Sequence, residues 1–337
     1  MELNRLAPPP ALQPDAIQLS LVLPCYREVE HIDVSVPRIL RVLADLPFAS
    51  EIIFVDDASP DDTVAHLERL RLAYAPWPMR LLRHATNQGR GAAVTTGFRA
   101  ARGRWVGFID VDLEVPPDYI AVCCRILDEG WDVCIGSRYY PATLGALPRF
   151  LASTIYRKLA WRVLGLPQID SESGYKFFVR ERVLPLLDRT VSRHWFWDTE
   201  IVVESYLAGL RVAHTPCLHL RRTDKTSTVR LVRDSLYFVR ELWRLRRDLA
   251  RRGEPRRAVP PPALVRPIAH RNLVTRASTT GWQVADDGHP TRGAGAGTAG
   301  GLSVERATDG NGRAVSPRAP RTDTDVDQVD AAGRPLR

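Results

Sequence analysis

The first half of the chain alternates short apolar runs with longer segments in which apolar residues recur every three or four positions. The apolar runs predict buried strands at Ile17–Leu23, Glu51–Val55, Arg80–Leu82, Arg104–Ile109 and Trp131–Ile135. The segments between them predict helices near 31–46, 61–75, 90–102 and 117–129. This alternation is typical of an α/β fold, with a mainly parallel sheet covered by helices on both faces. In such sheets ligands bind at the carboxyl ends of the strands.

The second half is more helical and ends in a change of composition. It predicts helices at Phe150–Leu164 and Asp198–Ala208, strands at Tyr175–Val179 and Arg211–Cys217, and a long amphipathic helix over 228–252. Beyond Gly253 the chain is dominated by Pro, Gly, Ala, Thr, Arg and Asp, so we expect 253–337 to be disordered. We expect the same of residues 1–16, which leaves 17–227 as the folded domain.

Charge and cysteine content narrow the class of protein and its cellular environment. The net charge is +8, and residues 221–252 alone contain eleven Lys or Arg against four Asp or Glu, which indicates a local anionic partner. The five cysteines have neither metal-ligand nor disulfide-scaffold spacing, so we expect them to be reduced and buried. The start of the chain has no signal-peptide pattern, and no run reaches the roughly 18 apolar residues of a membrane span. We therefore expect a cytoplasmic protein, peripherally associated with the inner face of the membrane.

Two carboxylates stand where the fourth predicted strand ends. Asp110 and Asp112 follow the apolar run through Phe108, and Glu114 comes two residues later. Carboxylates at a strand end can hold Mg²⁺ or Mn²⁺, and such a cation is usually shared with substrate phosphates. A surface loop with scattered acids gives the same pattern, so the remaining strand ends decide between these interpretations.

The other strand ends also carry polar residues. Tyr26 and Glu28 follow Pro24 and can bind a base or ribose, although Glu28 also suits the first turn of a helix. Asp56 ends the second strand, ahead of a Ser59 to Asp62 segment that helix capping explains. After the third strand, Gly89-Arg90-Gly91 opens a helix whose free amides favour an anion, although Gly-x-Gly alone is a weak motif. After the fifth strand, Arg138 can pair with a phosphate, although a surface arginine gives the same pattern.

The second half adds one acid of interest. Asp198 follows three aromatic residues and precedes a predicted helix. It can orient or deprotonate an acceptor, or it can simply cap the helix.

Taken in order, these motifs resemble the family 2 glycosyltransferases with a GT-A fold, a Rossmann-like fold that binds nucleotide-diphosphate sugars. The ordered set covers about residues 17–230 and is closest to the polyprenyl-phosphate (dolichol-phosphate) mannose and glucose synthases. It comprises Pro24–Glu28, Val55–Ser59, Asn87–Gly91, Asp110–Asp112, Gly136–Arg138, Gly174–Lys176 and Trp197–Glu200.

The resemblance implies a role for each matching residue. The nucleotide sugar would be bound by Pro24, Tyr26, Glu28, Asp56, Gly89, Arg90 and Asp110. The metal would be held by Asp110, Asp112 and Glu114, with Asp112, Asp198 and Arg138 in the catalytic group. The acceptor phosphate would be bound by Arg138, Arg221, Arg222 and Lys225. The chain departs from the family at Arg90, where Lys is frequent, and at Asp170–Ser173, where Asp-Thr-Gln-Cys is commoner.

The basic segment fits a membrane-bound acceptor. In the predicted 228–252 helix one apolar stripe contains Val229, Val232, Leu236, Val239 and Trp243, with Phe238, Leu242, Leu245 and Leu249 beside it. Arginines lie largely on the other side. This pattern is typical of a helix at a membrane surface, and equally of a helix that packs on its own domain.

The sequence thus predicts a metal-dependent inverting transferase that moves a hexose, mannose before glucose, from GDP-mannose or UDP-glucose to a polyprenyl monophosphate. One alternative is the same fold with a soluble hydroxyl acceptor, such as a small glycerate or a glycan. A second is a nucleic-acid-binding protein that uses the basic helix, although its arginines lack interleaved aromatics and the body of the chain is not basic. A third is a scaffold without activity.

Overall fold

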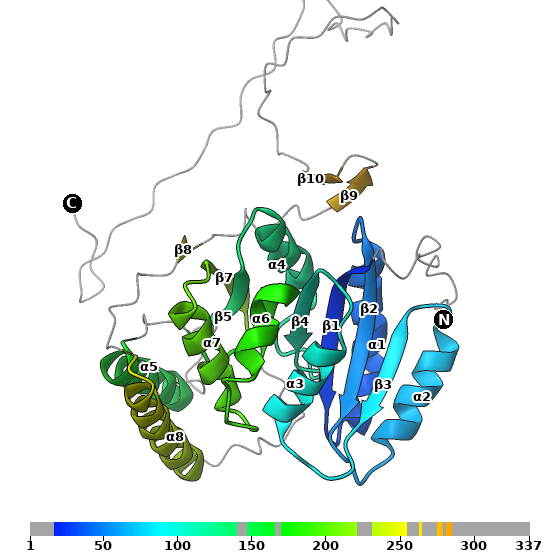
Figure 1. Ribbon diagram of the computed structural model, residues 1–337. Helices are drawn as coiled ribbons and strands as arrows, with labels where there is room; N and C mark the ends of the chain where they lie inside the picture. Colours follow the sequence, from blue (N-terminus) through cyan, green and yellow to red (C-terminus); the bar gives the residue numbers. More distant parts are fainter. Residues whose placement is uncertain are drawn as a thin grey trace, which may run out of the picture. The chain divides into compact units, whose positions relative to one another are not determined.

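The computed structural model describes residues 17–139, 147–165, 170–220, 231–254, 263–264, 275–278 and 281–284. Its main feature is an eight-stranded sheet in the order β3-β2-β1-β4-β6-β5-β7-β8 (Figure 1). The strands are β1 (Ile17–Cys25), β2 (Ala49–Asp56), β3 (Met79–Arg83), β4 (Trp105–Ile109), β5 (Val133–Tyr139), β6 (Tyr175–Val179), β7 (Val212–Leu218) and β8 (Ala263–Leu264). The helices are α1 (Val29–Ala44), α2 (Thr63–Ala73), α3 (Arg90–Ala100), α4 (Tyr119–Asp128), α5 (Leu147–Leu164), α6 (Arg180–Leu187), α7 (Trp197–Leu207) and α8 (Leu231–Arg251).

Helices cover both faces of this sheet, as the alternating pattern predicts. On one face α1, α2 and α4 pack on side chains such as Leu21, Phe54 and Phe177. On the other face α3, α6 and α7 pack on Val22, Phe108 and their neighbours, and these helices stand in front of the sheet in Figure 1. The five cysteines are free thiols and buried, as expected. The α/β prediction with a mixed, mainly parallel sheet is confirmed.

Strand β6 is the exception to the parallel arrangement. It lies between β4 and β5 and is antiparallel to both, with Ile109 opposite Tyr175. Because its direction is reversed, β6 begins at the edge where β4 ends. The segment before it, residues 170–174, therefore reaches the same edge as the polar strand ends of β1, β2 and β4.

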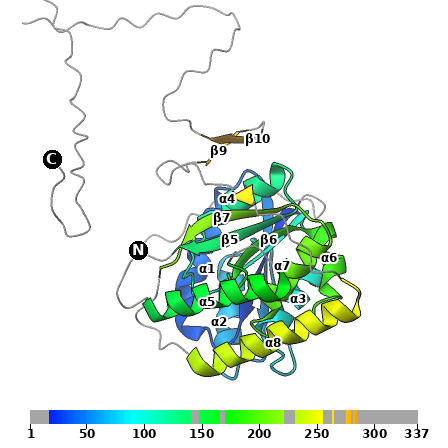
Figure 2. The same ribbon diagram turned by 90° about the vertical axis from the view of Figure 1, so that its left-hand side faces the viewer.

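A further cluster lies outside the two main layers. Helices α5 and α8 run side by side across α7 (Figure 2). The buried side chains between them include Tyr156, Phe196, Leu242, Leu245 and Leu249. Helix α8 is thus a packed part of the domain along one face, as the second interpretation of the 228–252 segment predicts.

Several boundaries differ from the sequence prediction. The last strand of the first half continues past Ile135 to Tyr139, because Gly136–Tyr139 pair with Thr215–Leu218 of β7. Helix α6 was not predicted, since it is short, contains Pro185 and follows β6 without a loop. Its signal is the buried set at three- and four-residue spacing: Val183, Leu186 and Leu187.

The segment expected to be disordered also contains regular structure at three places. Strand β8 pairs with β7, and β9 (Thr275–Ser278) pairs antiparallel with β10 (Gly281–Val284). The expectation rested on the scarcity of apolar side chains, whereas these strands form by backbone pairing. The remaining residues of 1–16 and 253–337 lie outside the described residues, apart from Gly253 and Glu254.

Candidate active site

The polar strand ends meet at one edge of the sheet, and Arg90 lies at their centre. Arg90 is the first residue of α3, and its Nε donates to Asp110 Oδ1 at 2.8 Å. Its Nη1 donates to Asp198 Oδ2 at 2.6 Å. The guanidinium also lies between two aromatic rings, 5.1 Å from the centroid of Phe108 and 4.9 Å from that of Trp195. Arg90 therefore joins α3, β4 and α7.

Asp198 is engaged on both carboxylate oxygens. It is 1% exposed, and its Oδ1 accepts from Lys176 Nζ at 2.6 Å while Oδ2 faces Arg90. Lys176 itself is fully buried on β6 and also donates to the carbonyl of Ser173. Burial lowers the pKa of Lys176, and Asp198 opposes that shift by stabilising the ammonium. Asp198 thus stabilises two cations from different elements.

Asp110 and Asp112 stand directly after β4, as predicted. Burial raises the pKa of Asp110, the neighbouring carboxylates Asp112 and Asp198 add to the rise, and Arg90 opposes it. Gly174 leaves room for this carboxylate, because a Cβ there would lie 1.9 Å from Asp110 Oδ2. The glycine before β6 is therefore required by the close approach of Asp110 and not by its own backbone angles.

A third pair lies further along the edge. Arg138 donates to Asp170 from Nε and Nη2, each at 2.7 Å, and from its backbone N–H at 3.0 Å. Asp170 is buried; burial alone would raise its pKa, but Arg138 outweighs this and lowers it. Arg138 was predicted to neutralise phosphate, and in the structure its bidentate partner is Asp170.

Glu172 shares this arginine at longer range. Its Oε2 is 3.8 Å from Arg138 Nη2, and the side chain is 21% exposed. Burial, together with Asp170 and Asp198, raises the pKa of Glu172 to about 7, while Arg138 and Lys176 oppose the rise. Burial is the main cause of this rise, and Asp170, which has the closer contact with Arg138, adds to it.

The charges of this cluster suit a divalent cation. Five carboxylates face three cations, so the ionised cluster has two negative charges in excess. The carboxylates are Asp110, Asp112, Asp170, Glu172 and Asp198, and the cations are Arg90, Arg138 and Lys176. Carboxylate oxygens are the ligands that Mg²⁺ and Mn²⁺ prefer. The donor set therefore fits a divalent metal that is shared with substrate phosphates.

Glu114 is placed differently from the prediction. Its Oε2 is 3.1 Å from His219 Nε2, and its carbonyl accepts from the Leu220 amide at 2.7 Å. Across the part of the chain that the structure describes, no three His, Cys, Asp or Glu side chains are grouped closely enough to hold a metal ion together. Asp110 and Asp112 remain as the candidate pair, with Glu114 turned toward His219.

The predicted nucleoside residues lie at the ends of β1 and β2. Pro24 is in β1, and Tyr26 follows it 41% exposed, with the Arg27 guanidinium 5.4 Å above its ring. The Glu28 amide donates to Thr63 Oγ1 at 3.0 Å. Asp56 is fully buried and accepts from the Ser59 amide at 3.2 Å, so turn formation also accounts for it.

Asp57 is a positioning residue that the sequence did not single out. Its carboxylate accepts from the amides of Gln88 at 2.8 Å and Gly89 at 2.7 Å, and lies 2.7 Å from His84 Nδ1. It thereby fixes the loop before α3, in which Gly89 has a φ of 101°. The signal was present as the second acid of the Asp56-Asp57 pair, which follows a buried strand.

The predicted phosphate-binding residues Arg221, Arg222 and Lys225 lie outside the described residues, as does the side chain of Val232 and all of Val229. The rest of the predicted apolar stripe of α8 divides into two. Leu242, Leu245 and Leu249 are buried against α5 and α7, whereas Leu236 is 67% and Trp243 49% exposed. The described helices include none that is both long enough and apolar enough to span a bilayer.

Comparisons with known proteins agree with this fold. The sequence model of the family described as "Glycosyl transferase family 2" matches residues 20–184, so the chain carries a family 2 glycosyltransferase domain. Within this family, glycosyltransferase AglD of Haloferax volcanii is 32% identical over 70% of the chain, which spans 39% of that relative. Dolichol-phosphate mannosyltransferase of Pyrococcus furiosus is 34% identical over 36% of the chain and 34% of the relative.

Two further matches extend over more of their own length. Dolichyl-phosphate beta-glucosyltransferase of Drosophila melanogaster is 29% identical over 57% of the chain and 63% of the relative. Glucosyl-3-phosphoglycerate synthase of Mycobacterium tuberculosis, solved with Mn²⁺, UDP and glucosyl-3-phosphoglycerate, has a TM-score of 0.52 at 19% identity, covering 71% of the chain and 81% of that structure. This structural likeness shows that the fold is that of the GT-A glycosyltransferases.

Proposed function

We propose that this protein transfers a hexose from a nucleotide-diphosphate sugar to a polyprenyl monophosphate, with mannose favoured and glucose next. The observation that carries the proposal is the Asp110–Arg90–Asp198 cluster at the sheet edge, with its excess of negative charge beside Asp112. The dolichol-phosphate mannosyl- and glucosyltransferases among the relatives support the lipid phosphate as acceptor. GDP-mannose and UDP-glucose are accordingly the donors to test.

The reaction is a single displacement. An oxygen of the acceptor phosphate attacks the anomeric carbon, the bond from that carbon to the diphosphate oxygen breaks, and its electron pair leaves with the nucleoside diphosphate. Attack from the face opposite the leaving group inverts the anomeric configuration. A phosphate monoester is already ionised at neutral pH, so the acceptor needs no general base. Asp198 fits this scheme as a positioning residue, because both of its oxygens are held by cations.

Asp110 and Asp112 would hold Mg²⁺ or Mn²⁺, and Glu114 could join them after leaving His219. When bound, the metal would stabilise the negative charge of the leaving diphosphate as a Lewis acid. Arg90 orients Asp110 toward that position through its 2.8 Å hydrogen bond. Tyr26 and Glu28, at the end of β1, would receive the base and ribose, and Arg221, Arg222 and Lys225 remain the proposed phosphate-binding cations.

The outer face of α8 would bind an anionic membrane surface, where the acceptor lipid resides. Leu236 and Trp243 project from this face, and Arg240, Arg247 and Arg251 are exposed beside them. An exposed apolar stripe flanked by arginines combines burial in acyl chains with attraction to lipid phosphates. Among the described side chains of the helix, the opposite face is already buried against α5 and α7, which leaves this stripe accessible.

A second candidate, with the same donor chemistry, is transfer to a soluble hydroxyl acceptor. Glu172 favours it, because a carboxyl with a pKa of about 7 that is 21% exposed can accept the proton of an attacking hydroxyl. The likeness to glucosyl-3-phosphoglycerate synthase concerns the fold and adds no acceptor information.

The testing experiment supplies GDP-mannose or UDP-glucose with a short polyprenyl phosphate and Mg²⁺ or Mn²⁺, each with and without EDTA. Formation of a glycolipid from one donor, abolished by EDTA, is the expected result. Slow hydrolysis of a donor without transfer to the lipid would instead direct the search to hydroxyl acceptors. Absence of both transfer and hydrolysis with either donor would overturn the proposal.

A further inference from the structure

The loop between α6 and α7 lies over the first turn of α3, where Arg90 begins. Its residues 191–195, here called the covering loop, contact α3 at three points. The Ala92 amide donates to the Arg193 carbonyl at 3.0 Å, His194 lies against Gly89, and the Trp195 ring lies 4.9 Å from the Arg90 guanidinium. The position of this loop therefore affects the position of Arg90.

Burial of apolar surface does little to hold the covering loop. Val191 is 65% exposed and Trp195 is 56% exposed. Instead, the buried carboxylate of Glu200 on α7 accepts from the amides of Val191 at 2.8 Å and Ser192 at 2.7 Å, both at Oε2. Glu200 thus anchors the first two residues of the loop to α7.

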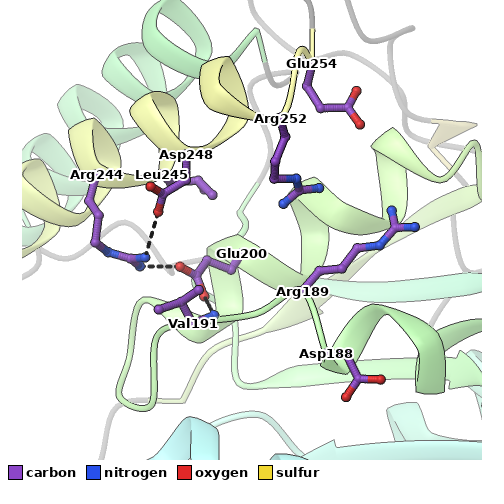
Figure 3. A pocket seen from close by; sticks show the side chains of 9 residues that line it. All are labelled: Asp188, Arg189, Val191, Glu200, Arg244, Leu245, Asp248, Arg252 and Glu254. Carbon is purple, nitrogen blue, oxygen red and sulfur yellow. Dashed lines mark hydrogen bonds and ion pairs between the residues drawn. The ribbon is translucent and has the colours of Figure 1, made fainter.

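Helix α8 completes this anchor. The other oxygen of Glu200, Oε1, accepts from Arg244 of α8, as Figure 3 shows. Arg244 also bonds Glu241 at 2.7 Å and Asp248 at 3.3 Å along its own helix. Glu200 is only 1% exposed, so its charge depends on these partners more than on water.

We propose that Glu200 and Arg244 are positioning residues of the donor site: through them, α8 fixes the covering loop over Arg90 and so fixes Arg90 against Asp110. The path runs from Arg244 to Glu200, then to the covering loop, and through Trp195 to Arg90. The inference rests on the proposed function only for the identity of the nucleotide.

The same helix pair contains a matched control. Arg252, which directly follows the last residue of α8, donates to Glu204 of α7 at 2.6 and 3.0 Å, in the same cavity of about 530 Å³ that Arg244 and Glu200 line. Glu204 is as buried as Glu200. The side-chain oxygens of Glu204 contact Arg252 and, at 3.8 Å, Arg189, which precedes the covering loop. Loss of the Arg252 pair therefore weakens the α7–α8 contact without releasing the loop.

The test compares Arg244→Gln and Glu200→Gln with Arg252→Gln in the full-length chain. One measurement is hydrogen exchange of the Val191 and Ser192 amides, and the other is calorimetric binding of GDP and UDP with Mn²⁺, without any lipid. We expect Arg244→Gln and Glu200→Gln to raise amide exchange about tenfold and to weaken nucleotide binding about fivefold. We expect Arg252→Gln to leave amide exchange and nucleotide binding unchanged, although it should lower the melting temperature by as much as the other two variants or more.

Equal effects of Arg244→Gln and Arg252→Gln on both measurements would overturn the inference, because the α7–α8 contact would then act only through general stability. Faster amide exchange with unchanged nucleotide affinity would overturn it too. If the wild-type chain bound neither nucleotide, the proposed function would fail. Hydrogen exchange would still test the anchoring of the loop, because the Val191 and Ser192 amides should exchange faster in Arg244→Gln and not in Arg252→Gln.

Discussion

Arg90 and Asp198 are 108 residues apart in sequence, yet Arg90 Nη1 lies 2.6 Å from Asp198 Oδ2. Lys176 binds the other oxygen of the same carboxylate at 2.6 Å. We expect Asp198→Asn to lower the free energy of unfolding by about 3–5 kcal/mol, because the buried Lys176 loses its counter-ion and Arg90 loses one of its two carboxylate partners. Denaturant unfolding measures this, and turnover falls with it. A variant as stable as the wild type but without turnover would instead mean that Asp198 acts on the acceptor.

For Asp112 the metal assignment predicts a loss of turnover without a loss of stability. This residue is only partly buried, in the turn after β4. We expect Asp112→Ala to reduce metal-dependent turnover by at least about 100-fold, because loss of even an outer-shell partner of a metal ligand typically costs about 10–100-fold, while the melting temperature stays the same. Asp118→Ala, at an exposed acid a few residues later, is the control and should retain activity. Normal turnover in Asp112→Ala would contradict the assignment.

A substitution at Gly174 tests how closely the segment before β6 approaches the proposed metal-binding acids. A methyl group there would lie 1.9 Å from Asp110 Oδ2 and 2.5 Å from Arg90 Nη2. We expect Gly174→Ala to cost about 1–3 kcal/mol of stability, as overpacking does, and to weaken Mn²⁺ binding. Gly209→Ala is the comparison, since it has a φ of 71° but no atom within 4 Å of the added methyl. It should cost stability through backbone strain and leave Mn²⁺ binding unchanged.

The raised pKa of Glu172 predicts that this residue makes the stability of the protein depend on pH. Its folded pKa is about 7 against 4.5 in the unfolded chain. The folded state therefore binds more protons between these values, and this group makes stability fall as pH rises through them. We expect Glu172→Gln to gain up to about 3 kcal/mol relative to the wild type at pH 8, and nothing at pH 4.

The comparison must be made between variant and wild type at each pH, in EDTA. Burial lowers the pKa of His214 to about 4, so this histidine titrates over an overlapping range with the opposite effect on stability. The difference between the two proteins removes that contribution. Equal stability of Glu172→Gln and wild type at pH 8 would mean that Arg138 keeps Glu172 ionised without cost.

Substitutions on the outer face of α8 should weaken membrane binding without affecting folding. We expect the double variant Leu236→Ser and Trp243→Ser to weaken binding to vesicles with anionic lipids by about tenfold or more, because it removes two exposed apolar side chains. Leu72→Ser on α2, at a leucine that is 70% exposed, is the control. Vesicle co-sedimentation measures the difference. Equal binding by all three proteins would assign membrane contact to another surface.

The sequence by itself determined most of the helices and strands and located the polar residues that follow the strands. Apolar runs and helical spacing predicted all but one helix of the described sheet layers, because burial on two faces of a sheet leaves a strong periodic pattern. Polar residues directly after strands, such as Asp56 and Asp110, could be located for the same reason. The family resemblance added the order of these motifs, and residues 20–184 match the family 2 model.

Only the tertiary structure decided which of these residues touch. The antiparallel insertion of β6 between β4 and β5 brings Gly174 to Asp110 and Lys176 to Asp198, and strand direction is not encoded in a five-residue apolar pattern. The pairing of Arg138 with Asp170 follows from the same insertion. Likewise, the apolar side of α8 is wider than the part that packs, and its contact with α5 and α7 alone selected the residues that are buried, leaving Leu236 and Trp243 exposed. Such choices depend on contacts between residues far apart in the chain, which local periodicity does not contain.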